Sequence, residues 1–247
     1  MKAILRVIGW IVFGGCICVQ AQAVVLFSDD FNRADSSVVG NGWSDMSTNS
    51  PSDLLIKNST LTTQSVGGQA GIYRAFAFDR NLTLSATLTE ASAFGGLPDG
   101  FEADLGVLNN GNADTGYRVS VTHSDSGIND SSVRLFDGAV FVDRIYSAFQ
   151  FTDKLEISIT FAMDGVVSGI VSQGIQDFTF AFGARSILSN GNNIGIHTSL
   201  PNANASSFVY PQIDDFVLSA DPVPEPATLG LLAVGLAGLG VSRRKQT

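Results

Sequence analysis

"KLEISITFAMDGVVSGIVS", residues 154–172, contains two alternating runs of apolar and polar residues on either side of Asp164-Gly165. From Leu155 to Phe161 every second residue is apolar. Successive side chains of a β-strand point to opposite faces, so this alternation predicts a strand with one buried face. Asp-Gly between two such runs indicates a tight hairpin turn. The stretch therefore predicts two adjacent antiparallel strands.

The same pattern recurs through the middle of the chain. "SVRLFDGAVFVDRI", residues 132–145, has a second Asp-Gly between alternating runs. Further strand-like runs lie at 81–90, 117–123, 178–185, 192–200 and 213–220. We find no convincing amphipathic helix of twelve residues between 24 and 220. Short strands separated by turn-forming Asp, Asn, Gly and Ser predict an all-β, two-sheet antiparallel sandwich.

Cysteine content and charge limit the possible functions. Cys16 and Cys18 are the two cysteines of this 247-residue chain. Both precede Val24, so the body up to about Ala220 has no disulfide and must be stabilised by a hydrophobic core. That body has 21 Asp and Glu against 9 Lys and Arg, a formal charge of −12. Nucleic-acid binding depends largely on neutralising phosphates, so we expect no nucleic-acid partner.

The first 23 residues have a basic start, an apolar middle and small residues at the end. These are Lys2 and Arg6, residues 7–19, and Ala21 with Ala23. The order is typical of a signal-peptide helix that directs the chain to the general secretion machinery, with signal peptidase cutting after Ala23. Two alternatives remain open: lipidation of Cys16 in "FGGC", and an uncleaved anchor helix.

The end of the chain, residues 221–247, has three parts. They are the segment Val223, Pro224, Glu225 and Pro226, an apolar run at 227–241, and a basic end with Arg243, Arg244 and Lys245. Crossing a bilayer core takes about 20 residues, so the apolar run predicts a short transmembrane helix suited to temporary membrane attachment. The prolines disfavour helix at and before Glu225, which predicts an extended site open to a protease.

This tail resembles the PEP-CTERM sorting signal of Gram-negative bacteria. The resemblance implies that an exosortase, a membrane-embedded cysteine protease, recognises the Pro-Glu-Pro segment and processes the tail. It also implies that the protein passes through the inner membrane to the cell surface or exterior. Proteins with this signal are associated with extracellular polysaccharide and biofilm matrix.

The body resembles a second family. "LFSDDFNRADSSVVGNGWSD", residues 26–45, and "YPQIDDFVLSAD", residues 210–221, are similar to the first and last strands of concanavalin A-like (laminin G-like) jelly rolls. "FEADLGVLNN" and "GYRVSV" are similar to their middle strands. The resemblance implies a jelly-roll sandwich over residues 24–220 in which the first and last strands pair, and it carries no activity by itself.

Residues with catalytic potential are few. Glu102 and Asp104 resemble part of the Glu-x-Asp-x-x-Glu strand of laminarinase-like hydrolases, but Val107 occupies the third carboxylate position. Retaining hydrolysis needs two suitably placed carboxyl groups, so we interpret this pair as solvent-facing residues at the rim of a strand. His123 and His197 are interpreted as structural or surface residues. We therefore predict no catalytic residue and no enzyme activity.

A calcium site and a sugar platform are further hypotheses. Similar jelly-roll modules often hold a structural calcium near their terminal strands, which makes Asp30 and Asp215 the candidate ligands. The alternative is that these aspartates cap turns or face solvent. Aromatic residues that could stack on sugar rings or belong to the core are Trp43, Tyr73, Tyr117, Tyr146 and Tyr210.

Together these features predict an exported surface or matrix protein whose body is a candidate for binding glycan or exopolysaccharide. Two other functions remain open: a divergent glycan hydrolase or lyase of the same fold, and a structural matrix protein without a specific ligand.

Overall fold

The computed structural model describes part of the chain. The described residues are 23–46, 54–63, 69–76, 78–89, 102–109, 115–122, 131–184, 192–199 and 212–221. Val24–Ala220 forms one compact unit, which contains every described strand. The signal-peptide helix and the transmembrane helix expected at the two ends lie outside the described residues. In the part that is described, no helix is long and apolar enough to cross a membrane.

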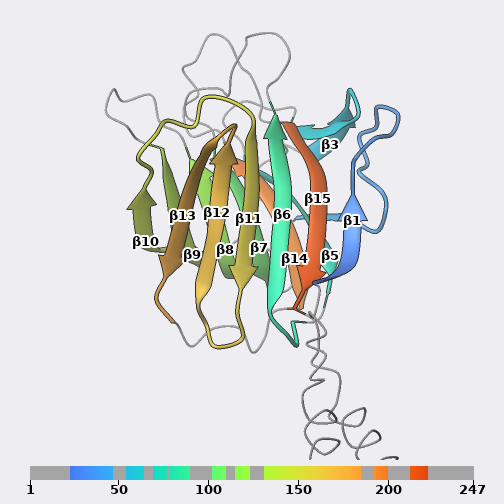
Figure 1. Cartoon of the computed structure of the whole chain (residues 1–247). Helices are drawn as coiled ribbons and strands as arrows, with labels where there is room; N and C mark the ends of the chain where they lie inside the picture. Colours follow the sequence, from blue (N-terminus) through green and yellow to red (C-terminus); the bar gives the residue numbers. More distant parts are fainter. Residues whose placement is uncertain are drawn as a thin grey trace, which may run out of the picture. The chain divides into compact units, whose positions relative to one another are not determined.

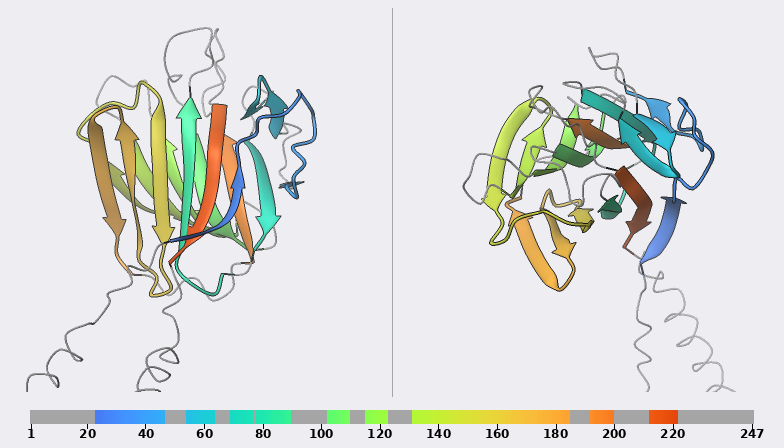
Figure 2. Two further views of the ribbon diagram at one scale, coloured as in Figure 1. Left: turned by 45° about the vertical axis from the view of Figure 1, so that its right-hand side comes forward. Right: turned by 90° about the horizontal axis from the view of Figure 1, so that it is seen from above.

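Two antiparallel sheets lie face to face, as the sequence predicts (Figures 1 and 2). One described sheet has eight strands in the order β13-β12-β11-β6-β15-β4-β3, with β1 also paired to β15. Its strands are β1 (Val24–Asp29), β3 (Leu54–Lys57), β4 (Thr60–Thr63), β6 (Leu82–Thr89), β11 (Leu155–Phe161), β12 (Val167–Gln173), β13 (Gln176–Phe182) and β15 (Gln212–Ala220).

The other described sheet has seven strands in the order β10-β9-β8-β7-β14-β5-β2. Its strands are β2 (Ser44–Asp45), β5 (Gln69–Ala75), β7 (Glu102–Leu108), β8 (Gly116–Thr122), β9 (Ser132–Asp137), β10 (Val140–Tyr146) and β14 (Asn193–Ser199). This sheet presents one face to the eight-stranded sheet and the opposite face outward (Figure 2).

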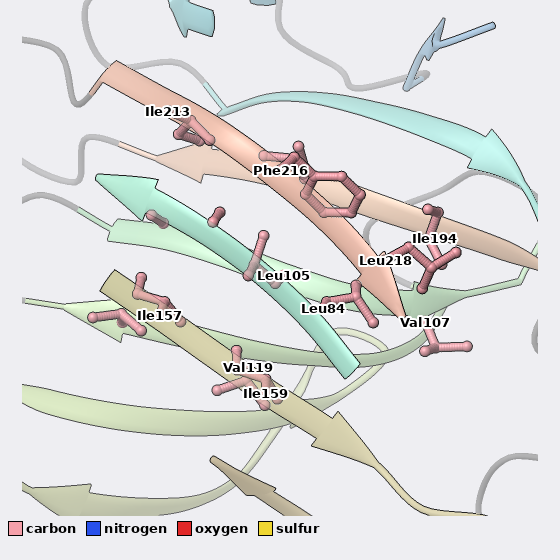
Figure 3. Close-up of a cluster of buried hydrophobic side chains, with 14 of the residues drawn as sticks. Leu84, Leu105, Val107, Val119, Ile157, Ile159, Ile194, Ile213, Phe216 and Leu218 are labelled. Atoms are coloured by element: carbon pink, nitrogen blue, oxygen red, sulfur yellow. The ribbon is translucent and has the colours of Figure 1, made fainter. Parts of the chain in front are cut away.

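The alternating apolar residues form the core between the sheets. Leu84, Ile159 and Leu218 of the eight-stranded sheet face Leu105 and Val119 of the other (Figure 3). All five are less than 5% exposed. Burying each such side chain contributes about 1.5–3 kcal/mol. This core accounts for the stability of a body without disulfides.

Both predicted Asp-Gly hairpins are confirmed. β11 pairs with β12 in a register that closes at Phe161 opposite Val167, and Gly165 has a φ of 87°. β9 pairs with β10 around Gly138, whose φ is 59°. Glycine takes positive φ without steric cost, so each Gly can follow its Asp in a tight turn.

β15 occupies a central position although it is the last strand in the sequence. It pairs with β6 along one edge, while its other edge pairs with β4 at Ile213 and with β1 from Phe216 onward. The register shifts between Asp214 and Val217, and Asp215 has a φ of 49°. This bulge lies in the ladder with β6, at the point where the other edge of β15 changes partner from β4 to β1. The β1–β15 ladder confirms the expected pairing of the terminal strands.

Four strands were not expected from the sequence: the short strands β2, β3 and β4, and the seven-residue strand β5. β3 and β4 form a hairpin around Asn58 and Ser59, whose φ values are 53° and 61°. Positive φ at both central residues matches a type I′ turn, but Asn-Ser is a weaker signal than Asn-Gly or Asp-Gly. β2 has only two residues, too few for any alternation to register.

Candidate functional site

Five outward-facing side chains form a row across the seven-stranded sheet. They lie in direct cross-strand register: Arg144 of β10, Arg134 of β9, Ser120 of β8, Asp104 of β7 and His197 of β14. We call this set the polar row. Neighbours along each strand, such as Leu105, Val119 and Ile196, lie in the core, so alternation places the row on the opposite face.

Asp104 is the centre of a buried charged cluster. Its Oδ2 accepts a hydrogen bond from Nη1 of Arg118 at 2.5 Å and another from Nδ1 of His197 at 2.8 Å. Burial works to raise the pKa of Asp104, but the hydrogen bond from His197 and the charge of Arg118 outweigh it, so the pKa is lowered below 3.8. Asp104 is therefore an ionised anchor for two cationic or polar partners.

Glu102 lies one row further along β7, with Ser120 donating a hydrogen bond to its Oε1 at 2.8 Å. Burial raises the pKa of Glu102 above 4.5, and the negative charge of Asp104 adds to the effect. The two carboxyl groups therefore differ in their electrostatics, although they stand two residues apart on the same strand.

Several polar atoms of this face are buried without a hydrogen-bond partner. They include Oδ1 of Asp104, Nε2 of His197 and Nε of Arg118, Arg134 and Arg144. A buried polar group without a partner costs about 1–3 kcal/mol. The face thus retains unused hydrogen-bonding capacity.

Arg134 and Arg144 are directly opposite each other on β9 and β10. Burial lowers the pKa of Arg134, and the positive charge of Arg144 lowers it further. Among the described residues neither guanidinium has a carboxylate within ion-pair distance. Arg144 instead donates to the hydroxyl of Tyr146 at 3.0 Å.

Aromatic rings and guanidinium groups alternate beside the polar row. The guanidinium of Arg118 lies 4.2 Å from the ring centre of Phe136, whose ring packs edge-on against Phe141 at 5.9 Å. The Arg144 guanidinium lies 5.6 Å from Phe141 and 5.5 Å from Tyr146. These cation–π contacts hold the planar groups in place.

Exposure increases steadily toward the β10 edge. Asp104 and His197 are 1% and 3% exposed, whereas Phe141 and Tyr146 are 50% and 56% exposed. The β5 and β14 side of the face is covered by a small apolar cluster of Met46, Leu108 and Tyr73. The accessible part of the face is thus the strip over β9 and β10.

Glycine gives Arg118 the space it needs on this face. A Cβ on Gly106 would lie 2.9 Å from the Cβ of Arg118 and 2.7 Å from the Tyr117 carbonyl oxygen. A side chain at this position would therefore clash with the backbone and the Cβ of β8 unless the two strands moved apart.

The structure corrects the interpretation of Glu102 and Asp104 as solvent-facing rim residues. Asp104 is buried and Glu102 is half-buried. Val107 lies in the core, because regular alternation along β7 turns it away from the two carboxyl groups. His197 is a buried partner of Asp104, and His123 lies outside the described residues.

The candidate aromatic platform divides in a similar way. Trp43 and Tyr117 belong to the core, and Tyr73 packs in the Met46 cluster. Tyr146 is exposed beside Arg144, while Tyr210 lies outside the described residues. Phe141 is a platform residue that the sequence did not single out, although its position in the predicted Asp-Gly hairpin could have located it.

The terminal aspartates form a second feature of the body. Asp29 accepts five hydrogen bonds, from the backbone NH of Phe31, two nitrogens of Arg33, the Asn41 amide and the Trp43 indole. Burial works to raise the pKa of Asp29, but the hydrogen bonds led by Arg33 lower it overall. Gly40, Asn41 and Gly42 all have positive φ, which brings Trp43 back to Asp29. The "GNGW" segment is thereby explained as structural.

Asp30 and Asp215, the predicted calcium ligands, line a hollow of about 390 Å³ between β1 and β15. Calcium takes about 6–8 oxygen ligands. Asp29 already accepts five hydrogen bonds, and the described residues contain no group of three or more His, Cys, Asp or Glu side chains placed to hold a metal. The described residues thus do not supply a carboxylate-rich site, and calcium binding stays a prediction.

The predicted sorting residues fall at the ends of the chain. Residues 223–226, residues 243–245 and Ala21 lie outside the described residues, and Ala23 is the first residue described.

Comparison with known proteins finds one similarity for the tail of this chain and another for its body. Residues 222–245 match the PEP-CTERM protein-sorting motif. The body has the lectin-like, concanavalin A-like fold, which confirms the resemblance seen in the sequence. No curated protein sequence matches the chain.

Solved structures carry the fold assignment. Basic winged bean lectin with Tn-antigen has a TM-score of 0.57 and 11% identity, over 81% of this chain and 99% of its own. The carbohydrate recognition domain of Emp47p has a TM-score of 0.55 and 15% sequence identity, and the match covers 82% of this chain and 98% of that domain. The CBM2 module of the evolved Dit of Lactobacillus casei BL23 phage J-1 has a TM-score of 0.55 and 10% sequence identity, and the match covers 83% of this chain and 99% of that module.

Proposed function

We propose that this is an exported surface or matrix protein whose body binds glycan through the outward face of the seven-stranded sheet. The sorting motif at 222–245 supports delivery by an exosortase to the cell surface or exterior. The lectin-like fold is compatible with glycan binding without establishing it.

One observation carries the choice of binding face. The β9–β10 strip combines two exposed rings, Phe141 and Tyr146, with the guanidinium groups of Arg134 and Arg144. Ring faces can stack on pyranose sugars, and partly buried polar groups can hydrogen-bond their hydroxyls.

A glycan array probed with the Val24–Ala220 unit tests this function, since that unit contains the described core. We expect binding that is lost in the double variant F141A/Y146A. F141A and Y146A each remove an exposed side chain, so folding should be retained, as judged by circular dichroism. Ile175, fully exposed at the β12–β13 turn, provides the control I175A. Absence of binding to any glycan would favour the structural matrix alternative.

Glycan cleavage is a second candidate, favoured by the position of Glu102, Asp104 and His197 on one face. Against it, Asp104 is bound to Arg118 and no third carboxylate stands at position 107. Incubation with matrix polysaccharide followed by a reducing-sugar assay tests it. We expect no sugar release; release that is abolished by E102Q would establish an enzyme instead.

A further inference from the structure

We propose that the glycan bound by this face is acidic, and that Arg134 and Arg144 bind an oxyanion carried on its sugar rings. This inference rests on the proposed glycan-binding function and specifies the chemical class of its ligand.

The first argument is the cross-strand pairing of two like charges. Arg134 and Arg144 stand directly opposite in the antiparallel register of β9 and β10. Like charges at such positions are destabilising. The chain maintains this repulsion on a partly buried surface, where Arg134 is already disfavoured as a cation by burial. An anion between the two groups would relieve both effects.

The second argument compares these residues with other arginines. Three of the other four described arginines form an ion pair, Arg33 with Asp29, Arg80 with Asp79 and Arg118 with Asp104. The fourth, Arg74, donates to the Asn41 carbonyl. Arg134 and Arg144 form none within the described residues, and the Nε of each is buried without a partner. Glu102 and Asp104 act on Arg134 only from beyond ion-pair distance, and Asp104 is already held by Arg118.

The third argument is the match between donor geometry and ligand. A guanidinium presents a planar fork of N–H donors that fits the two oxygens of a carboxylate, and it also binds sulfate. Arg144 is held between Phe141 and Tyr146, whose exposed rings can stack on a sugar. A uronic acid or sulfated sugar provides both the ring and the oxyanion.

The fourth argument is charge. A body with a formal charge of −12 repels acidic polymers over most of its surface. The outward face of β7 to β10 counts three arginines, Arg118, Arg134 and Arg144, against Glu102 and Asp104. Binding of an acidic glycan should therefore be confined to this strip and should weaken as salt rises.

The experiment measures binding of the Val24–Ala220 unit to polygalacturonate, dextran sulfate and unmodified dextran. We expect polygalacturonate or dextran sulfate to bind, and the stronger of the two identifies carboxylate or sulfate as the preferred group. R144Q and R134Q should each weaken binding by about tenfold or more, since a hydrogen bond to a charged group is lost. R144K retains the charge without the planar fork and separates the two contributions.

R80Q is the matched control, because it removes the same charge from the exposed Arg80 paired with Asp79. It should leave binding unchanged. Because Arg144 is on the edge strand β10, we expect R144Q to fold even if R134Q is perturbed. Two results would overturn the proposal that the ligand is acidic while leaving glycan binding intact. One is that unmodified dextran binds as tightly as the acidic polymers, and the other is that R144Q and R134Q bind them as tightly as R80Q does. No binding to any of the three polymers, together with an empty glycan array, would refute both.

Discussion

At the scale of single residues, Asp104 is the carboxylate on which the outward face depends. It holds Arg118 and His197 in a region that is almost fully buried. We expect D104N to lower the free energy of unfolding by about 3–5 kcal/mol, since removing one partner leaves a buried cation uncompensated. Urea unfolding measures the loss. D177N, at an exposed position on β13, should change it by less than about 0.5 kcal/mol.

The contribution of Asp104 should also depend on pH. Its folded pKa is lowered below 3.8, so its stabilisation is present above the unfolded pKa and disappears as pH falls through the folded value. A difference between wild type and D104N that stays constant down to the most acidic pH at which the protein remains folded would contradict the ionised state of Asp104.

We expect the opposite dependence of stability on pH for Glu102. Burial, followed by the charge of Asp104, raises its pKa above 4.5 in the folded protein. As pH rises through 4.5 the unfolded chain ionises first, so ionisable Glu102 lowers the stability of the folded state. We therefore expect E102Q to be more stable than wild type at pH 7 and equally stable well below pH 4.5. Thermal unfolding of both proteins across this pH range checks the prediction. A stability difference between E102Q and wild type that is the same at every pH would show that ionisation of Glu102 plays no part.

The sequence indicated which residues share a face but not whether that face is covered. Alternation placed Glu102 and Asp104 on one side of their strand. Its partners Arg118 and His197 are distant in sequence and meet Asp104 only through sheet register. This is why a solvent-facing role was expected and a buried cluster was found.

At the scale of elements, the segment between β1 and β2 is organised by Asp29. We expect D29A to lower the free energy of unfolding by about 2–3 kcal/mol, because it removes five hydrogen bonds, two of them from Arg33. D30A is a close control, since exposed Asp30 accepts only a local bond from the Asn32 backbone among the described residues. Urea unfolding of both variants decides the matter, and equal losses would show that Asp29 is not the organising residue.

The β1–β15 hollow also supports a test for calcium. If Asp30 and Asp215 bind calcium, added Ca²⁺ should raise the melting temperature, by an amount equivalent to about 2.7 kcal/mol at 100 times the Kd. D215N should abolish the response, while Asn still tolerates the φ of 49° at the bulge. A melting temperature that responds to neither Ca²⁺ nor EGTA would exclude the site.

Elements with strong local signals were predicted well. The Asp-Gly hairpins β9–β10 and β11–β12 could be placed from sequence because the turn chemistry and the alternation agree. β3 and β4 were missed, because four-residue strands give too little alternation to be recognised. In the structure β4 pairs with β15 at Ile213, and β3 joins the sheet through β4.

At the scale of the whole molecule, the prediction concerns sorting. Replacing Pro224, Glu225 and Pro226 by alanine should stop processing and retain full-length protein in the membrane fraction, because the extended tripeptide is the proposed exosortase site. Mass spectrometry of the carboxyl terminus, with R80Q as an unrelated control, measures processing. Unaltered maturation of the triple variant would contradict the sorting proposal.

The two-sheet architecture followed from sequence because the pattern that predicts it is distributed over the whole body. The proposed binding face did not, because Arg134, Asp104 and His197 are far apart in the chain and no local motif joins them. Register across five strands brings the polar row together.

The central position of β15 links folding to delivery. Synthesis reaches this strand last, and without it β6 loses a neighbour while β1 and β4 lose the strand that anchors them. A ribosome that stops before residue 212 releases a product that lacks both this strand and the address at 222–245. Such incomplete copies lack the proposed exosortase signal, so on the proposed route only a polypeptide translated through residue 245 carries both the complete sheet and the sorting motif.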